Sequence, residues 1–284
     1  MRSTTYRQDQ AATLRKMTLN NSLELIHRPH VITITSGKGG VGKSTIALNL
    51  ALKLGEFENN VLLVDADTNL GKLDVMLGVS PTLRCGDILR SERAVEDVAV
   101  SISSNVKLLA GNSGDSNRPL LTKEKQKSFL NALVSTEEHF DYVVIDTSAG
   151  LTENVIGFAT FSDLTVVVSN PEPITVIDAY AIIKAIRFAD DSVPVKVLMN
   201  GSRKPSEADD AMMKLKMAAS HFLQCDVPYL GSIPYDRYTS EAIVQQQPLV
   251  HCYPSSGASL SLELLARHIN TTFQQQTRTR GMAS

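Results

Sequence analysis

Residues 37–44 read GKGGVGKS, and this stretch decides the fold. It matches the pattern G-x-x-x-x-G-K-[ST] and stands between a predicted strand and a predicted helix. Glycines allow the backbone to curl so that successive N–H groups point at phosphate oxygens, and the positive N-terminal end of the helix adds to this attraction. Lys43 is expected to neutralise the β- and γ-phosphates of a nucleotide, and the Ser44 hydroxyl to hold Mg²⁺. The residues predicted to bind the phosphates are Gly39, Gly40, Val41, Gly42, Lys43, Ser44 and Thr45.

Around this loop, short apolar runs rich in β-branched residues alternate with stretches of helical spacing, such as residues 174–188. Most runs show no polar alternation, which is typical of parallel strands covered on both faces. The order predicts an α/β fold with one doubly wound, mainly parallel sheet. It also disfavours the alternative that residues 37–44 are a glycine-rich turn with an incidental lysine. The predicted strands are 31–35, 61–64, 106–109, 142–145, 164–168, 195–199 and 229–233.

Carboxylates follow two of these strands. Asp65 and Asp67 come after the run 61–64, and Asp146 follows the run 142–145. Ligands of doubly wound sheets bind at the carboxyl ends of the strands, so we expect these acids to meet the phosphate loop at one edge. Phosphoryl transfer to water requires one group that orients the attacking water and others that hold Mg²⁺. The alternative for each aspartate is a structural role, in which it caps a loop or ends a buried strand.

The composition narrows the class of protein. Of 284 residues, 43% are hydrophobic and 20% charged, as in a globular protein. The 28 Lys and Arg residues balance 30 Asp and Glu residues, so no strong nucleic-acid binding is expected. Cys85, Cys225 and Cys252 form no C-x-x-C pair, which argues against a zinc ribbon or a thioredoxin-type site. Because the sequence shows no secretory signal and no apolar run near about 18 residues, we expect a cytoplasmic protein.

Lys38 requires a separate explanation, because Lys43 already serves the phosphates within one subunit. Residues 38–45, KGGVGKST, resemble the deviant Walker A motif of the MinD/ParA ATPases, which belong to the SIMIBI class of P-loop NTPases. The resemblance implies that Lys38 reaches across a homodimer to the ATP of the other subunit, so that ATP bridges two copies. The alternative is a solvated lysine beside a phosphate of its own subunit.

The same resemblance implies roles for residues at the neighbouring strand ends. Asp67 takes the switch I position that orients the attacking water, and Asp65 lies beside the metal. Asp146 takes the Walker B position, which binds Mg²⁺ through water. Residues 146–150, DTSAG, are similar to the D-x-x-A-G switch II of the family, so the Gly150 N–H is expected to sense the γ-phosphate. These roles together imply a slow, Mg²⁺-dependent ATP hydrolase.

Recognition of the base is assigned to two further strand ends. Asn200 ends an apolar strand, and its amide can both donate to and accept from the edge of adenine. The resemblance places the adenine-reading asparagine of the family here and a second base contact at residues 233–236. Pro234 and Tyr235 are therefore candidate contacts. The alternative is that these residues serve turns.

Three longer stretches narrow the resemblance to the FlhG-type (FleN/YlxH) flagellar-number regulators. Residues 9–15 read DQAATLR, residues 65–78 read DADTNLGKLDVMLG, and the third stretch is 231–259. The resemblance implies a protein that is a monomer without ATP and a dimer with it. It also implies control of flagellar number or placement through FlhF, an SRP-type GTPase, with flagellar switch proteins or a flagellar transcriptional regulator as possible further partners. The implied GTPase contacts are Asp9, Gln10, Leu14 and Arg15.

The organisation of the chain follows from these assignments. We expect an N-terminal extension over residues 1–29, a single ATPase domain over 30–273 and a polar tail over 274–284. Residues 9–19 have the pattern of a short amphipathic helix, with a disordered tail as the alternative. An apolar stripe near the C-terminus packs on the sheet or acts as at most a weak membrane anchor. The stripe consists of Leu262, Leu265, Ala266, Ile269 and Phe273.

Two other kinds of ATPase remain to be weighed against a flagellar regulator. A ParA-like protein that partitions DNA or other cargo is the alternative function, and it requires a basic face of which the sequence shows no evident cluster. An iron–sulfur ATPase requires paired cysteines near a dimer axis, and the three single cysteines do not fit this requirement. Lys72 departs from the asparagine that the FlhG-type proteins often have at its position in switch I.

Overall fold

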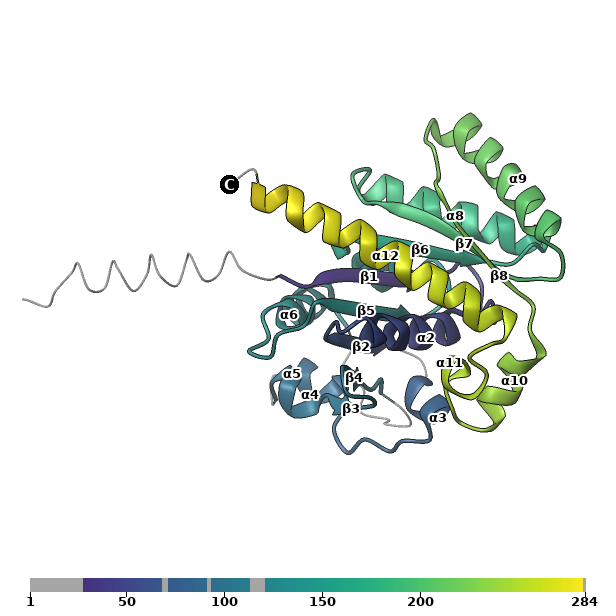
Figure 1. Cartoon of the computed structure of the whole chain (residues 1–284). Coiled ribbons are helices and arrows are strands. Elements are labelled where there is room, and N and C mark those ends of the chain that lie inside the picture. Colours follow the sequence, from purple (N-terminus) through teal and green to yellow (C-terminus); the bar gives the residue numbers. More distant parts are fainter. Residues whose placement is uncertain (1–27, 68–70, 91–92, 113–120, 283–284) are drawn as a thin grey trace, which may run out of the picture.

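The computed structural model describes residues 28–67, 71–90, 93–112 and 121–282. Within these residues, one eight-stranded sheet carries helices on both faces (Figure 1). The strands are β1 His30–Thr35, β2 Val61–Ala66, β3 Val100–Ser101, β4 Val106–Leu109, β5 Tyr142–Thr147, β6 Leu164–Ser169, β7 Val195–Ser202 and β8 Tyr229–Pro234. The helices are α2 Lys43–Glu56, α3 Leu73–Leu77, α4 Cys85–Leu89, α5 Val95–Val98, α6 Lys123–Val134, α7 Glu153–Phe161, α8 Pro173–Ala189, α9 Pro205–Leu223, α10 Arg237–Val244, α11 Leu249–Cys252 and α12 Gly257–Met282.

The strand order is β3-β4-β2-β5-β1-β6-β7-β8, and every pair except β3–β4 is parallel. This confirms the predicted doubly wound, mainly parallel sheet. All seven predicted strands are present. β3, an antiparallel edge strand of two residues, was not predicted from the sequence, because two residues are too few to show a pattern. β2 and β5 each run two residues further than predicted, so Asp65 and Asp146 lie inside the strands instead of after them.

The uninterrupted apolar runs result from burial on both faces of the sheet. Ile32 and Ile34 of β1 pack in a core formed with α2 and α12. Val31, which points to the opposite face, packs in a second core with α6 and α7. A third core joins β6 and β7 to α8 and α9. The sheet is therefore covered on both sides, and its carboxyl edge remains accessible between the helices.

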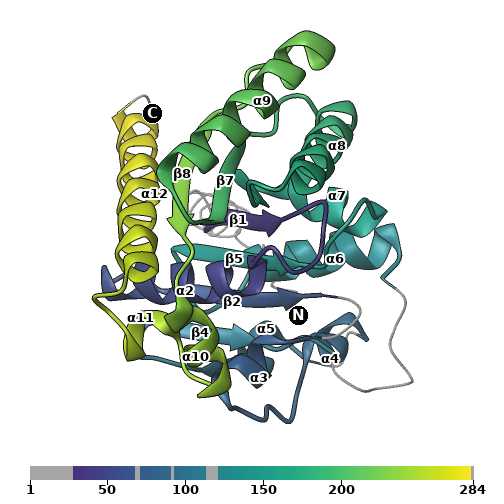
Figure 2. The same cartoon turned by 90° about the vertical axis from the view of Figure 1, so that its right-hand side faces the viewer.

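The C-terminal helix α12 packs on the first core. Its five-residue apolar stripe is buried, and α12 contacts α2 and β8 (Figure 2). The stripe thus packs on the fold, as the first of the two predicted alternatives. The helix continues beyond Phe273 to Met282, where a polar tail had been expected, and the Thr277 hydroxyl lies 3.2 Å from Nε2 of His30. No helix among the described residues is both long and apolar enough to cross a membrane.

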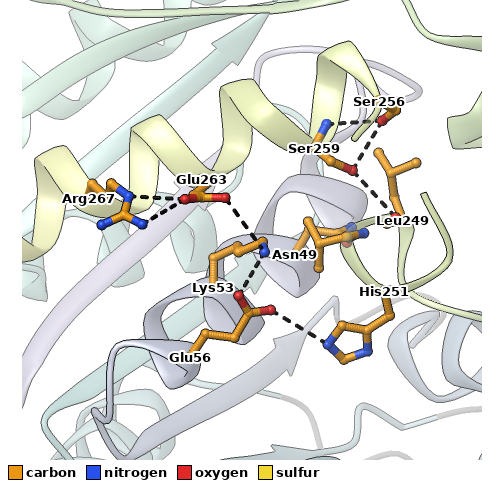
Figure 3. Close-up of polar contacts among 10 residues, drawn as sticks. Asn49, Lys53, Glu56, Leu249, His251, Ser256, Ser259, Glu263 and Arg267 are labelled. Atoms are coloured by element: carbon orange, nitrogen blue, oxygen red, sulfur yellow. Dashed lines mark hydrogen bonds and ion pairs between the residues drawn. The ribbon is translucent and has the colours of Figure 1, made fainter. Parts of the chain in front are cut away.

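Polar contacts hold α12 and α11 to α2, the helix that follows the phosphate loop (Figure 3). The Lys53 ammonium is buried on α2, 2.7 Å from the Glu56 carboxylate and 3.9 Å from that of Glu263 on α12. The Asn49 side chain donates to the Thr45 carbonyl (2.7 Å) and accepts from the Val250 N–H (3.0 Å). A buried ammonium requires such partners, because an unpaired charge in the core is costly. The C-terminal elements therefore help to position α2.

Candidate functional site

The sheet topology brings the predicted site residues to one edge. β1, which leads into the phosphate loop, lies between β5 and β6. Asp65 of β2 and Asp146 of β5 are partners in the parallel register. On the other side of β1, Asn200 of β7 pairs with Ile233 of β8, which places Asn200 next to Pro234. The predicted convergence of the phosphate loop and the aspartates at the carboxyl edge is thus what the structure shows, and the segment assigned to base recognition ends at the same edge.

The conformation of the phosphate loop depends on its glycines. Gly40 and Gly42 have φ values of 82° and 95°, in the region that side chains with a Cβ rarely adopt. A Cβ on Gly39 or Gly40 would meet nothing within 4 Å, so this part of the loop borders open space. A Cβ on Gly37 would instead collide with the backbone of Asp178 in α8. The loop is therefore packed against α8 at its start and open at the place where phosphates are expected.

The two lysines of the loop lie in opposite environments. The Lys43 side chain is 8% exposed, and burial lowers its pKa, although the nearby Asp146 and Asp67 carboxylates oppose this shift. The Lys38 side chain is 45% exposed, and its ammonium lies 3.8 Å from the Glu172 carboxylate at the start of α8. One lysine thus points into the site among the acids, and the other extends to the surface. Glu172 is a neighbour of Lys38 that the sequence analysis did not identify.

Asp146 has the features of a residue that holds a metal. Its carboxylate is hydrogen-bonded to the Ser44 hydroxyl and is fully buried, yet its Oδ1 atom has no hydrogen-bond partner among the described residues. Burial, followed by repulsion from Asp65, raises the pKa of Asp146 to about 8. Mg²⁺ prefers oxygen ligands and retains several of its waters, so Ser44 and Asp146 fit such an ion. A cation here would supply the missing partner of Oδ1 and lower the pKa of Asp146.

The Asp65 carboxylate forms its hydrogen bonds with backbone N–H groups of the same chain. Its Oδ2 atom accepts from the N–H groups of Lys72 (2.7 Å) and Leu73 (3.0 Å), and its Oδ1 atom accepts from the N–H of Asp67 (3.2 Å). Burial raises the pKa of Asp65 to about 6, while these three N–H groups oppose the shift. The carboxylate therefore shapes the loop between β2 and α3, which is the structural alternative that the sequence had left open.

Asp67, the predicted water-orienting residue, sits in the loop that Asp65 shapes. Its side chain is 13% exposed, and its Oδ2 atom lies 3.6 Å from the Lys72 ammonium. Asp67 also lies close enough to influence the pKa values of Lys43 and Asp146. Lys72 stands where the FlhG-type proteins often have an asparagine. Its ion pair with Asp67 was not predicted from the sequence. Spacing alone does not reveal this ion pair, because a separation of five residues matches neither the helical nor the strand period.

Gly150 and the segment before it are tied to the end of β1. Gly150 has a φ of 96°, and its N–H, which was predicted to sense the γ-phosphate, donates to the Ser36 carbonyl at 2.9 Å. The Thr147 hydroxyl donates to the Ile34 carbonyl at 3.1 Å. Contact between the Gly150 N–H and a phosphate thus requires the bond to Ser36 to open. In this structure switch II is joined to the strand that carries the phosphate loop.

The predicted base-reading residues lie beside the loop. The Asn200 amide donates to the Val41 carbonyl at 2.7 Å, so one of its N–H groups holds the phosphate loop. The Tyr235 ring is 61% exposed, and the Arg203 guanidinium lies 5.6 Å from its centre. These side chains could border a base, with the Asn200 carbonyl oxygen as an acceptor. Asp9, Gln10, Leu14 and Arg15 lie outside the described residues.

Comparisons with known proteins agree with this site. The family model described as ParA, NUBPL iron-transfer P-loop NTPase, matches residues 27–270. The chain is 30% identical over 246 residues to the antiactivator FleN of Pseudomonas aeruginosa, and the match covers 87% of this chain and 88% of FleN. It is 31% identical over 239 residues to the flagellum site-determining protein YlxH of Helicobacter pylori, covering 83% of this chain and 80% of YlxH.

A solved structure shows the same fold. The septum site-determining protein MinD of Pyrococcus horikoshii, complexed with Mg-ADP, has a TM-score of 0.71 and 26% identity to this chain. The alignment covers 85% of this chain and 96% of that MinD. The family match, the extended identity to FleN and YlxH and the phosphate loop at the sheet edge lead to one conclusion. This chain belongs to the ParA/MinD family of P-loop NTPases.

Proposed function

We propose that this protein is an ATP-dependent molecular switch that dimerises around ATP and hydrolyses it slowly with Mg²⁺. The contrast between the two loop lysines carries the proposal. Lys43 is buried among the acids of its own site, where it can neutralise phosphates of the same subunit. Lys38 is 45% exposed on the same loop, and its one charge partner among the described residues is the Glu172 carboxylate at 3.8 Å, so it is placed to reach an anion outside its own chain.

In this proposal the residues of the sheet edge divide the work of hydrolysis. The phosphate-loop amides and Lys43 bind the phosphates, while Ser44 and Asp146 hold Mg²⁺, which supplies neutralisation of charge on the phosphate oxygens. Asp67 orients and accepts a proton from the attacking water. Asp65 positions Asp67 by accepting a hydrogen bond from the Asp67 N–H. Asp65 would also lie beside the metal, because it is the register partner of Asp146 on the neighbouring strand. Asn200, Pro234 and Tyr235 border adenine.

The proposed output is control of flagellar number or placement. Support comes from the names of two relatives, the antiactivator FleN and the flagellum site-determining protein YlxH. We infer that the partner is an FlhF-like SRP-type GTPase, contacted through Asp9, Gln10, Leu14 and Arg15, with flagellar switch proteins or a transcriptional regulator as further candidates. The protein would work in the cytoplasm and bind the membrane or cell pole only transiently.

The dimer is tested by light scattering with ADP and with a non-hydrolysable ATP analogue. The wild type should be a monomer with ADP and a dimer with the analogue. Lys38→Ala should weaken the dimer at least about 100-fold, because each dimer loses two charge-assisted contacts. Its nucleotide affinity should change much less. Lys107→Ala is the matched control, since Lys107 also pairs with a glutamate, Glu138 at 2.6 Å, but on β4.

A wild type that stays monomeric at high concentration with the analogue bound would overturn the switch. The partner is tested separately with an FlhF-like GTPase and the Arg15→Ala full-length chain. We expect normal ATP hydrolysis and loss of GTPase stimulation. Unchanged stimulation by this variant and by Asp9→Ala would remove the N-terminal element from the proposal and leave the dimer unaffected.

A further inference from the structure

A groove between α8 and α9 stands apart from the phosphate loop. It has a volume of about 780 Å³, in the range of sites that bind ligands or peptide side chains. Its floor is apolar, and the lining residues that matter below are Val176, Ile177, Tyr180, Leu215, Ala218 and Phe222. Figure 2 shows α8 and α9 diverging on the side of the sheet opposite α12.

The groove exposes large apolar side chains that a folded surface usually covers. Ile177 is 65% exposed and Phe222 is 70% exposed, on facing helices. Ile174 on α8 and Met217 on α9, which are not part of the groove lining, are also exposed, at 65% and 64%. A contiguous apolar surface with a polar rim marks an interaction site. An amphipathic helix laid between two helices is a common occupant of such a groove.

The rim of the groove favours a basic occupant. Glu172, Glu207 and Asp210 line it, against Arg203 and Lys214. Acidic side chains outnumber basic ones by one in this lining, and Glu172 and Glu207 stand with Arg203 at the carboxyl edge of the sheet, where α8 and α9 begin. Complementary charge at a rim steers the partner and sets its orientation. The occupant should therefore have a narrow apolar face flanked by lysine or arginine.

The N-terminal segment of the same chain has this composition. Ala11, Leu14, Met17 and Thr18 recur at the three- and four-residue spacing of one helical face. Arg15 and Lys16 lie beside this face, and residues 1–27 carry four basic and two acidic side chains. We propose that residues 9–19 dock as an amphipathic helix in the α8–α9 groove of their own chain, with Leu14 on the apolar floor and Arg15 and Lys16 toward the acidic rim.

The chain can reach the groove. The Arg28 guanidinium lies 5.1 Å from the centre of the Phe161 ring at the end of α7, α7 packs against α8, and α8 packs against α9. The N-terminal segment therefore leaves the fold one helix away from the groove. α8 is about 25 Å long at 1.5 Å per residue. The linker of eight residues, 20–27, spans up to about 28 Å when extended, which exceeds the length of α8.

Docking would connect the segment to the phosphate loop. Glu172 belongs both to the rim of the groove and to the ion pair with Lys38. A basic side chain that binds Glu172 competes with Lys38 for the same carboxylate. Where the proposed function holds, the groove also covers the residues that contact the GTPase, so docking keeps them from the partner. The docking itself rests on neither nucleotide nor GTPase and is tested without them.

The test is hydrogen–deuterium exchange of the full-length chain, followed by mass spectrometry of the peptides that cover residues 9–19. In the wild type these amides should exchange at least about tenfold more slowly than free peptide, because a docked helix protects them. Ile177→Gln combined with Phe222→Gln should remove this protection. Phe188→Gln is the matched control, since Phe188 lies on α8, is 94% exposed and is not part of the groove lining.

Leu14→Gln tests the same contact by changing the N-terminal segment instead of the groove. It should speed exchange in residues 9–19 and in the groove helices together, and it leaves the folded domain untouched. If the groove variants lower the melting temperature of the domain, the exchange of the Leu14→Gln variant shows whether residues 9–19 dock in the groove. Equal exchange of residues 9–19 in the wild type and in both sets of variants would overturn the proposal. Protection that rises with protein concentration would also overturn it, because the occupant would then be the segment of a second copy.

Discussion

Asp65 and Asp146 face each other as register partners on adjacent parallel strands, yet their carboxylates have different surroundings. Asp65 accepts three backbone N–H groups, whereas Asp146 has the Ser44 hydroxyl and one oxygen without a hydrogen-bond partner among the described residues. The pKa of each is raised, to about 6 and about 8, with burial as the main cause. The structure thus separates an acid that accepts three backbone N–H groups from an acid that has one oxygen without a hydrogen-bond partner in the described part of the chain.

The first prediction concerns the role of Asp65 in the fold. Asp65→Ala leaves the Lys72 and Leu73 N–H groups without their acceptor, and an unpaired buried donor costs about 1–3 kcal/mol. We expect the free energy of unfolding to fall by about 2–4 kcal/mol, measured by denaturant titration without nucleotide. Asp65→Asn should cost less, because its remaining oxygen still accepts from Lys72 and Leu73. An alanine variant as stable as the wild type would contradict this role.

The second prediction concerns Asp67 and turnover. Asp67→Ala removes the proposed water-orienting carboxylate and leaves the loop hydrogen bonds of Asp65 in place. ATP binding and dimerisation should persist, and the hydrolysis rate should fall about 100-fold or more, as expected for loss of a general base. Phosphate release measures the rate, and light scattering measures the dimer. Normal hydrolysis by this variant would mean that another residue orients the water.

The third prediction follows from the pKa of Asp146. Folding raises this pKa from its ordinary value of 3.8 to about 8, so the folded chain holds a proton that the unfolded chain releases. The contribution of Asp146 to stability is therefore fully present below about pH 4 and is lost as the pH rises to about 8. Asp65 adds a loss of the same sign up to about pH 6.

Thermal unfolding in EDTA without nucleotide checks this behaviour. The wild type should melt at a lower temperature at pH 8.5 than at pH 6, and Asp146→Asn should show a smaller difference because it cannot ionise. The same variant should lose Mg²⁺-dependent nucleotide binding. Identical pH dependence in the variant and the wild type would show that Asp146 does not titrate over this range.

The fourth prediction concerns Lys43 and nucleotide affinity. A charge-assisted hydrogen bond contributes about 1.5–3 kcal/mol, so Lys43→Ala should weaken ATP binding about 10- to 100-fold or more. Fluorescent nucleotide titration measures the affinity, with Lys38→Ala as the comparison on the same loop. Because Lys43 is buried near Asp146 and Asp67, its removal also takes a positive charge away from both acids, although Asp67 keeps its ion pair with Lys72. Affinity equal to that of the wild type would contradict the phosphate-loop assignment.

Several features of the site could be predicted because they are local. Two glycines of the loop GKGGVGKS, Gly40 and Gly42, stand at positions with positive φ, and each apolar run that precedes an acid becomes a strand of the sheet. Asp67 and Asp146 could be named in advance because strands of a parallel sheet end at a common edge. The missed features depend on irregular or distant segments. β3 is too short for a pattern, and the ion pairs Lys72–Asp67 and Lys38–Glu172 join residues whose spacing has no period.

The amino-acid sequence by itself determined the sheet, the phosphate loop and the acids beside it, because hydrophobic period and glycine conformation act over a few residues. Only the tertiary structure decided that both carboxylate oxygens of Asp65 have hydrogen-bond partners, whereas one oxygen of Asp146 has none among the described residues. Asp65 and Asp146 look alike in sequence, each at the end of a buried strand. Their difference arises because the N–H groups of Asp67, Lys72 and Leu73 reach the Asp65 carboxylate, while Asp146 beside Ser44 keeps an oxygen that has no partner within the ranges that the structure describes. That choice depends on how distant segments pack, since desolvation and hydrogen bonding act through space.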